Sequence, residues 1–200
     1  MTPRLGASDR ERVLDFVRPL SVGIDGVTNF GFVERRLRIS EFLEDEEGKG
    51  KAAGEAGADP TRLFLLGAFA GLPSARRITP DSREELLLRS LHLPFEEISY
   101  LSRSLSRLES SPESPEERIV HDAMLLESVG AYGVTRLLVA GAREGMTLAE
   151  MAGEIEEKMA SARFATNAGR RLAADRVAFA TQFARKLAEE AGQFEAAPGP

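Results

Sequence analysis

The chain contains no cysteine and only two histidines among its 200 residues. The lack of cysteine excludes disulfide bonds, a thiolate nucleophile and a zinc site with cysteine ligands. It also favours a reducing compartment, so we predict a cytoplasmic protein. The two histidines, His92 and His121, do not have the one-turn spacing with which neighbouring imidazoles bind a single ion. A histidine-rich metal site is therefore excluded.

Long hydrophobic runs are also missing. No apolar run approaches the roughly 20 residues that cross a bilayer, and the first twelve residues lack the apolar centre of a signal peptide. We therefore predict neither export nor a membrane partner. The formal net charge is -6, which disfavours contact with nucleic-acid phosphates. We predict no nucleic-acid partner, and the arginines that would argue for one are expected to belong mostly to a solvated face: Arg35, Arg36, Arg38, Arg170 and Arg171.

Apolar residues recur three and four positions apart along most of the chain, and no segment shows the alternation of a strand. The sequence therefore predicts an all-α domain of about eight to nine helices over residues 1–192, followed by a disordered tail over residues 193–200. A first helix is expected over residues 8–20. A second helix carries Phe32, Ile39 and Leu43 on one stripe.

The segment 44–57 is rich in charge and glycine and has no aromatic or branched apolar residue, so we predict a mobile loop or insertion there. Asp59 and Pro60 then form a good helix start. The run from Leu63 to Leu72 is apolar or glycine on every face, which is typical of a helix surrounded by other helices. It is expected to be the central helix of the bundle.

The second half of the chain has clear helix-start signals. Ser114, Pro115 and Glu117 combine an N-cap, a first-turn proline and a capping-box acid, and Thr147 with Glu150 repeats the capping-box spacing. The helices expected after the central one cover residues 79–91, a segment from Pro94, Ser114 to Gly130, the buried residues 131–143, a segment from Thr147, and residues 167–191.

Residues 119–136, IVHDAMLLESVGAYGVTR, resemble a specific stretch of the HD superfamily of metal-dependent phosphohydrolases. In small bacterial members that stretch reads Ile-Val-x-Asp-Ala-Asp-x-Leu-x-x-Ile-Gly-Ala-x-Gly-x-x-Arg. Asp122 corresponds to the first aspartate of the pattern, whereas the metal-binding aspartate is the second, where this chain has Met124. His121 falls on a variable position. The His121-Asp122 pair is therefore not the motif that gives the family its name.

The resemblance extends to the other ligand positions. The buried helix that carries the family's His-Asp pair is similar to GADPTRLFLLGAFAGL, which places Ala70 and Gly71 at that pair. The family's first ligand, a histidine in His-Val-x-Arg-Val, corresponds to Phe32, and the arginine of that motif is retained as Arg35. A further histidine of some members falls on or near Leu108. The resemblance covers roughly residues 30–191. It includes the segment NAGRRLAADRVAFATQF of this chain, which resembles the family's last helix.

In the family, two histidines and two aspartates bind a divalent cation that polarises a phosphoryl group and activates water. Because Phe32, Ala70, Gly71 and Met124 stand at those positions, we expect an apolar remnant of the metal pocket and no metal cofactor. Arg35 and Asp122 are candidate polar groups of that pocket. The resulting hypothesis is a non-catalytic binding or regulatory module.

The alternative hypothesis is an enzyme, a metal-dependent phosphohydrolase that acts on a nucleotide or other phosphate ester through a relocated site. Glu34, Asp59 and Asp122 would be the nearest carboxylates. Under either hypothesis the partner is a small anionic ligand or a protein. Arg35 and Arg36 would attract an anion if they faced the cavity. The oligomeric state is left open, with a homodimer as one option.

Overall fold

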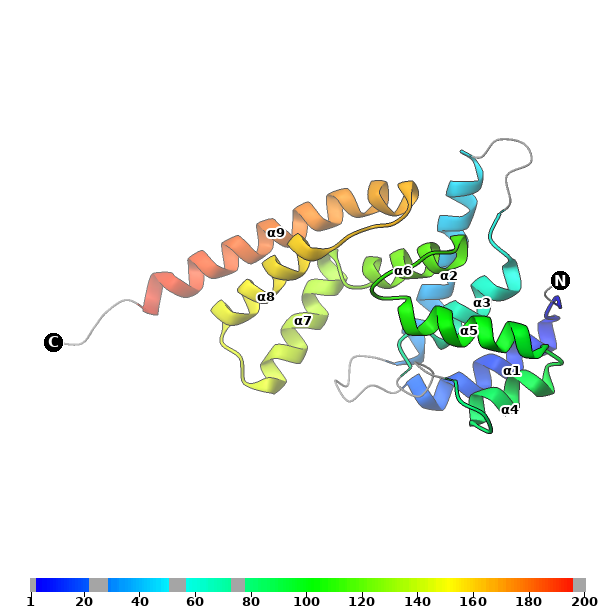
Figure 1. Ribbon diagram of the computed structural model, residues 1–200. Coiled ribbons are helices and arrows are strands. Elements are labelled where there is room, and N and C mark those ends of the chain that lie inside the picture. The colour runs from blue at the N-terminus through cyan, green and yellow to red at the C-terminus, as the bar shows by residue number, and fades with distance from the viewer. Residues whose placement is uncertain (1–2, 22–28, 51–56, 73–77, 196–200) are drawn as a thin grey trace.

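Figure 1 shows a computed structural model of the chain, which describes residues 3–21, 29–50, 57–72 and 78–195. These residues form nine α-helices and one short 3-10 helix and contain no strand. The helices are α1 Ala7–Val17, η1 Arg18–Ser21, α2 Phe30–Gly48, α3 Pro60–Phe69, α4 Arg83–Ser90, α5 Phe95–Arg107, α6 Pro115–Leu126, α7 Gly130–Glu144, α8 Leu148–Ser161 and α9 Asn167–Glu195. The predicted all-α fold class is confirmed.

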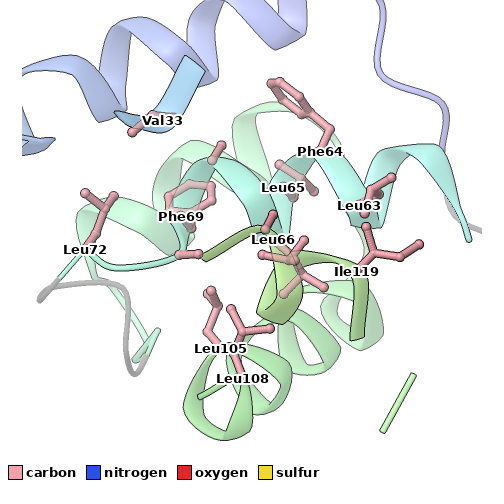
Figure 2. Close-up of a cluster of buried hydrophobic side chains, with 14 of the residues drawn as sticks. Val33, Leu63, Phe64, Leu65, Leu66, Phe69, Leu72, Leu105, Leu108 and Ile119 are labelled. Atoms are coloured by element: carbon pink, nitrogen blue, oxygen red, sulfur yellow. The ribbon is translucent and has the colours of Figure 1, made fainter. Parts of the chain in front are cut away.

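Helix α3 is the centre of the bundle, as its apolar sequence predicts. It contacts α1, α2, α5 and α6, and every residue from Leu63 to Phe69 is buried. Figure 2 shows Val33 of α2 on one side of α3, and Leu105 and Leu108 on another. A helix covered on so many sides needs apolar residues all round, because a polar group there would lose its hydration.

Helices α2 and α3 pack closely at Gly67. A Cβ atom at this position would lie 2.9 Å from Cδ2 of Leu37, so the missing side chain lets the two helices approach. Helix α3 then ends where Gly71 adopts a φ of +75°, a conformation that glycine tolerates without steric cost. The chain turn at Gly71 brings the end of α3 to the region where the resemblance places the former metal ligands.

Three predicted helix starts are confirmed. Asp59 accepts hydrogen bonds from the backbone N–H groups of Thr61 and Arg62, at 2.9 and 3.0 Å. Ser114 caps α6 by accepting from the N–H of Glu117 at 3.2 Å. Thr147 and Glu150 form the predicted capping box of α8. These short-range hydrogen bonds satisfy the free N–H groups of a first turn, which is why sequence spacing alone could locate them.

Several predicted boundaries are wrong. Helix α2 continues to Gly48, so residues 44–48 are helical, and residues 51–56 of the predicted loop lie outside the described residues. The helix expected from residue 79 begins at Arg83, because Ser82 supplies the N-cap and Asp81 has a φ of 62°. Helix α9 runs to Glu195, beyond the predicted start of the tail, and residues 196–200 are not described.

The prediction around Gly130 is also wrong. Helix α6 ends at Leu126, and Gly130 begins α7 with a φ of +72° instead of ending the preceding helix. The expected burial of residues 131–143 is found for only part of the segment, since Tyr132 and Val139 are 39% and 36% exposed. The physical reason is that α7 leaves the body of the bundle and is covered by α8 and α9 alone along much of its length.

Helices α7, α8 and α9 pack against one another and extend from the rest of the bundle, as Figure 1 shows in yellow-green to red. We call these three helices the arm and α1–α6 the body. Contacts of α9 with α2 and α6 join the arm to the body. In the described part of the chain no single helix is long and apolar enough to cross a membrane, although α6 and α7, bent by 65°, pass the same test as a pair.

A buried carboxylate links α5 to α6. Glu117 is fully buried, and it accepts hydrogen bonds from Ser104 Oγ at 2.6 Å, Arg107 Nε at 2.9 Å and the Glu113 N–H at 2.7 Å. Burial by itself would raise the pKa of Glu117, but hydrogen bonds from Arg107, Glu113 and Ser104 outweigh it and hold the pKa below its usual value. The ionised form therefore stabilises the fold.

Replacement of Glu117 by glutamine is expected to lower the free energy of unfolding at pH 7 by on the order of 2 kcal/mol, because charge-assisted hydrogen bonds are lost. A depressed folded-state pKa gives stability above the unfolded value, about 4.3, and loses it as the pH falls through the folded value. The difference between wild type and Glu117→Gln should thus shrink in acid, as measured by urea unfolding from pH 7 to pH 3. A difference that stays constant over this range would contradict the assignment.

Candidate functional site

A cavity of about 170 Å³ lies where the end of α3 meets α5 and α6. Ala70, Gly71 and Met124, three of the four predicted ligand positions, line it, and so does Leu108. The other lining residues are Phe69, Leu72, Leu105, Ser106 and Glu109. Seven of these nine residues are apolar or glycine, and Ser106 and Glu109 are the two with polar side chains, although about half of the exposed lining surface is polar.

Phe32, the fourth position, does not line this cavity. Its side chain is buried, and its ring packs against Tyr132 of α7 with a centroid separation of 5.4 Å. The guanidinium of Arg136 lies 4.7 Å from the centre of the same ring. Phe32 therefore belongs to the contact between α2 and the start of the arm.

Arg36, one turn after Phe32 on α2, connects the two regions. It is only 8% exposed. Its Nη1 donates a hydrogen bond to the carbonyl oxygen of Ala70 and a longer one, 3.4 Å, to that of Gly67. A Cβ placed on Gly71 would lie 3.5 Å from its Nη2. A positively charged guanidinium is thus held against the backbone at two of the predicted ligand positions.

Glu127 is the counterion of Arg36. Its Oε2 accepts from Arg36 Nε at 3.3 Å, and both side chains are almost completely buried. Burial lowers the pKa of Arg36 and raises the pKa of Glu127, and the attraction between the two charges opposes both shifts. The second oxygen, Glu127 Oε1, has no hydrogen-bond partner among the described residues. The pair is therefore a desolvated ion pair with incomplete hydrogen bonding, an arrangement that costs free energy if either partner is removed.

The residues present do not fit a divalent metal. Phenylalanine, alanine and glycine side chains donate no electron pair, and the thioether of Met124 is a poor ligand for hard cations. The place is also occupied, because the Arg36 guanidinium is hydrogen-bonded to Ala70 and paired with Glu127. Across residues 3–21, 29–50, 57–72 and 78–195, no group of three or more His, Asp or Glu side chains is arranged to hold an ion.

The two candidate polar groups of the pocket lie elsewhere. Asp122 is fully buried, but its carboxylate accepts hydrogen bonds from the N–H of Ala165 at 2.7 Å and from the N–H and hydroxyl of Thr166 at 2.8 and 2.6 Å. It fixes the loop before α9 to α6. The guanidinium of Arg35 stacks on the ring of Tyr132 at 4.5 Å and faces a different hollow of the molecule.

The two histidines lie outside the cavity. His121 is buried, with Nδ1 2.8 Å from the carbonyl oxygen of Leu108 and Nε2 3.0 Å from that of Arg163. It ties α6 to the end of α5 and to the loop after α8. His92 follows α4 with a φ of 58°, a left-handed conformation typical of the residue after a helix end. Neither imidazole lines the cavity.

The carboxylates of the alternative, enzymatic hypothesis are not brought together. Glu34 is exposed on α2, Asp59 caps α3, and Asp122 binds the loop before α9. Each of the last two is already used in backbone hydrogen bonds. These three residues therefore do not form a shared site.

Sequence reasoning named Arg36 only as a residue that would attract an anion in the cavity, and it missed the ion pair with Glu127. A signal was present, since Arg36 and Ser40 fall on the same face of α2 as Phe32 and Leu43, and all four are buried. An arginine on an apolar stripe indicates a buried counterion. The identity of that counterion could not be read from the sequence, because Glu127 is 91 positions away.

Comparison with protein-family models and with curated protein sequences finds no match. Solved structures do match. A HD-superfamily hydrolase from Bacillus thuringiensis superposes with a TM-score of 0.67 at 18% identity, over 95% of this chain and 98% of the hydrolase. The chain has the HD-superfamily fold.

Two further solved structures match this chain over a similar extent. A protein from Lactobacillus plantarum matches with a TM-score of 0.71 at 16% identity, over 95% of this chain and 100% of its own. The Bacillus subtilis protein YpgQ in complex with ADP matches with a TM-score of 0.64 at 17% identity, over 90% of this chain and 97% of YpgQ. At these identities the likeness establishes the fold alone. The chemistry of this chain depends on its own residues.

Proposed function

We propose that this protein is a non-catalytic HD-fold module that binds a ligand without a metal ion. The observation that carries the proposal is the buried guanidinium of Arg36 against the backbone of Ala70 and Gly71. The HD-superfamily resemblance implies that a divalent cation and its ligands belong at these positions. A guanidinium already stands at this place and pairs with the carboxylate of Glu127, and Met124 offers only a weak thioether donor.

Two measurements test this proposal. Protein purified in buffers containing Mn²⁺, Mg²⁺, Fe²⁺ or Zn²⁺ is expected to contain far less than one metal ion per chain. Elemental analysis by mass spectrometry measures this content. Its thermal midpoint should also be the same with excess Mn²⁺ and with a chelator, since a bound metal would stabilise the folded state. A stoichiometric ion whose removal lowers the midpoint would overturn the proposal.

The second candidate function is a metal-dependent phosphohydrolase acting on a nucleotide or other phosphate ester. It is favoured by the fold shared with an HD-superfamily hydrolase and with YpgQ, which was solved with ADP. A panel of nucleotides and simple phosphate esters, each assayed with several divalent cations, distinguishes the two. The non-catalytic proposal expects no phosphate release, whereas release that a chelator abolishes would support the enzyme.

A further inference from the structure

A second and larger hollow, of about 540 Å³, lies between α2, α7 and α9. It is separate from the cavity lined by Ala70 and Met124. Figure 1 shows the three helices where the arm joins the body. We call it the arginine groove, because Arg35 and Arg38 of α2 and Arg176 of α9 line it. Its volume is within the range of small-molecule sites, roughly 300–1,000 Å³.

The charge of the arginine groove is unusual for this acidic protein. No aspartate or glutamate lines it. Within the part of the chain that the structure describes, Arg35, Arg38 and Arg176 form no ion pair with a carboxylate, although most surface arginines of such a protein would have one nearby. Arg35 Nε is buried without a hydrogen-bond acceptor. The groove therefore has donors and positive charge and no carboxylate in its lining, while the charge of Arg35 also acts on the buried Glu127 outside the lining.

The arginines are also close enough to affect one another. Burial lowers the pKa of Arg176, and the positive charge of Arg35 lowers it further. Arg176 Nη1 reaches only a backbone carbonyl, that of Leu126, at 3.4 Å. Like charges held together are unfavourable in the free protein, and an anion placed between them would remove this repulsion.

The remaining lining of the arginine groove is apolar and partly open to solvent. Phe42 and Tyr132 are 49% and 39% exposed, and Ile39 completes this side. Exposed aromatic rings beside cations are typical of sites for ligands that have a flat apolar part as well as a charged one. Because the Arg35 guanidinium already stacks on Tyr132, its donors are held in a fixed orientation.

We propose that the arginine groove binds an organic phosphate of about nucleotide size, with its phosphoryl group between Arg35, Arg38 and Arg176 and its ring against Phe42 and Tyr132. Guanidinium groups match the geometry of phosphate oxygens through paired hydrogen bonds, and the three positive charges more than offset those of a doubly charged phosphoryl group. This inference rests on the proposed function, since it names the ligand class of a non-catalytic binding module. It places the ligand outside the former metal pocket.

Isothermal titration calorimetry of the full chain with AMP, adenosine and inorganic phosphate tests the inference. AMP is expected to bind, adenosine and inorganic phosphate to bind much more weakly. Arg38→Gln and Arg176→Gln should each weaken AMP binding by about tenfold or more, the loss typical of one charge-assisted hydrogen bond. Phe42→Ala should weaken the binding of AMP and leave that of inorganic phosphate unchanged.

The matched control is Arg103→Gln, which removes the same charge from an exposed position on α5, outside the arginine groove. It should leave AMP binding unchanged, and circular dichroism melting curves should show that all variants fold. AMP binding that survives both groove substitutions would overturn the inference, as would the absence of any phosphate binding at millimolar concentrations. A metal-free, inactive protein with either result would leave the proposed function standing.

Discussion

Replacement of Arg36 by methionine is expected to lower the free energy of unfolding by about 3–5 kcal/mol, the cost of leaving one buried charge without its partner. Glu127 would keep its burial and lose its counterion, since it is 2% exposed and Arg36 is its ion-pair partner. The carbonyl oxygen of Ala70 would also lose a donor. Urea unfolding followed by circular dichroism measures the change.

The pH dependence of this loss has a definite sign. Burial already raises the pKa of Glu127, and removal of the Arg36 charge raises it further. The loss should therefore be largest at neutral pH and smaller in acid, where protonation removes the unpaired charge. The double variant Arg36→Met with Glu127→Met should recover much of the stability, because an apolar pair can replace a buried ion pair at little cost.

Arg38→Met is the matched control for Arg36→Met. Arg38 is on the same helix but is exposed, so this change should alter stability by less than about 0.5 kcal/mol. If Arg36→Met were equally harmless, Arg36 would not be a buried charge that the fold depends on. The proposed replacement of a metal cation by a guanidinium would then lose its support.

Replacement of Asp122 by alanine is expected to cost on the order of 3 kcal/mol, because three hydrogen bonds to one buried carboxylate are lost together. The N–H groups of Ala165 and Thr166 would be left without acceptors. The carboxylate also packs directly against the first turn of α9, since a Cβ on Gly169 would lie 2.1 Å from Asp122 Oδ2.

Hydrogen exchange should locate this effect. Asp122→Ala is expected to speed amide exchange mainly in residues 165–170, where the loop enters α9, because that segment would open at lower cost. Asp175→Ala, which removes an exposed carboxylate one to two turns later, is the control and should change little. If residues 165–170 exchanged as slowly in Asp122→Ala as in the wild type, the start of α9 would not depend on this carboxylate.

The sequence predicted the fold well where the signal is local or periodic. The caps of α3, α6 and α8 depend on residues within three positions of each other, and the all-apolar run of α3 reports its central burial directly. The prediction that residues 131–143 are buried was wrong for part of the segment. Apolar spacing indicates which face of α7 is covered, but it does not indicate how many helices cover it. Only α8 and α9 accompany α7 in the arm.

The candidate site was predicted in part. Ala70, Gly71 and Met124 come together because α3 and α6 pack against each other, which the resemblance implied. The His121-Asp122 pair lies outside the lining of the cavity, and its role in tying the loop before α9 to α6 needs contacts more than 40 positions away. The arginine groove likewise depends on Arg38 and Arg176 meeting across the arm and body, which no spacing along the chain encodes.

Two glycines at the start of α7 allow close packing beside the arginine groove. A Cβ on Gly133 would lie 2.2 Å from the carbonyl group of Ser128, and one on Gly130 would lie 3.0 Å from Cβ of Arg176. Backbone therefore touches backbone where the arm turns by 65° from α6, and α9 rests directly on the turn. A side chain at Gly130 would press on Arg176 of the arginine groove, and one at Gly133 would push α7 away from the end of α6. The position of a groove arginine thus depends on a glycine that does not itself line the groove.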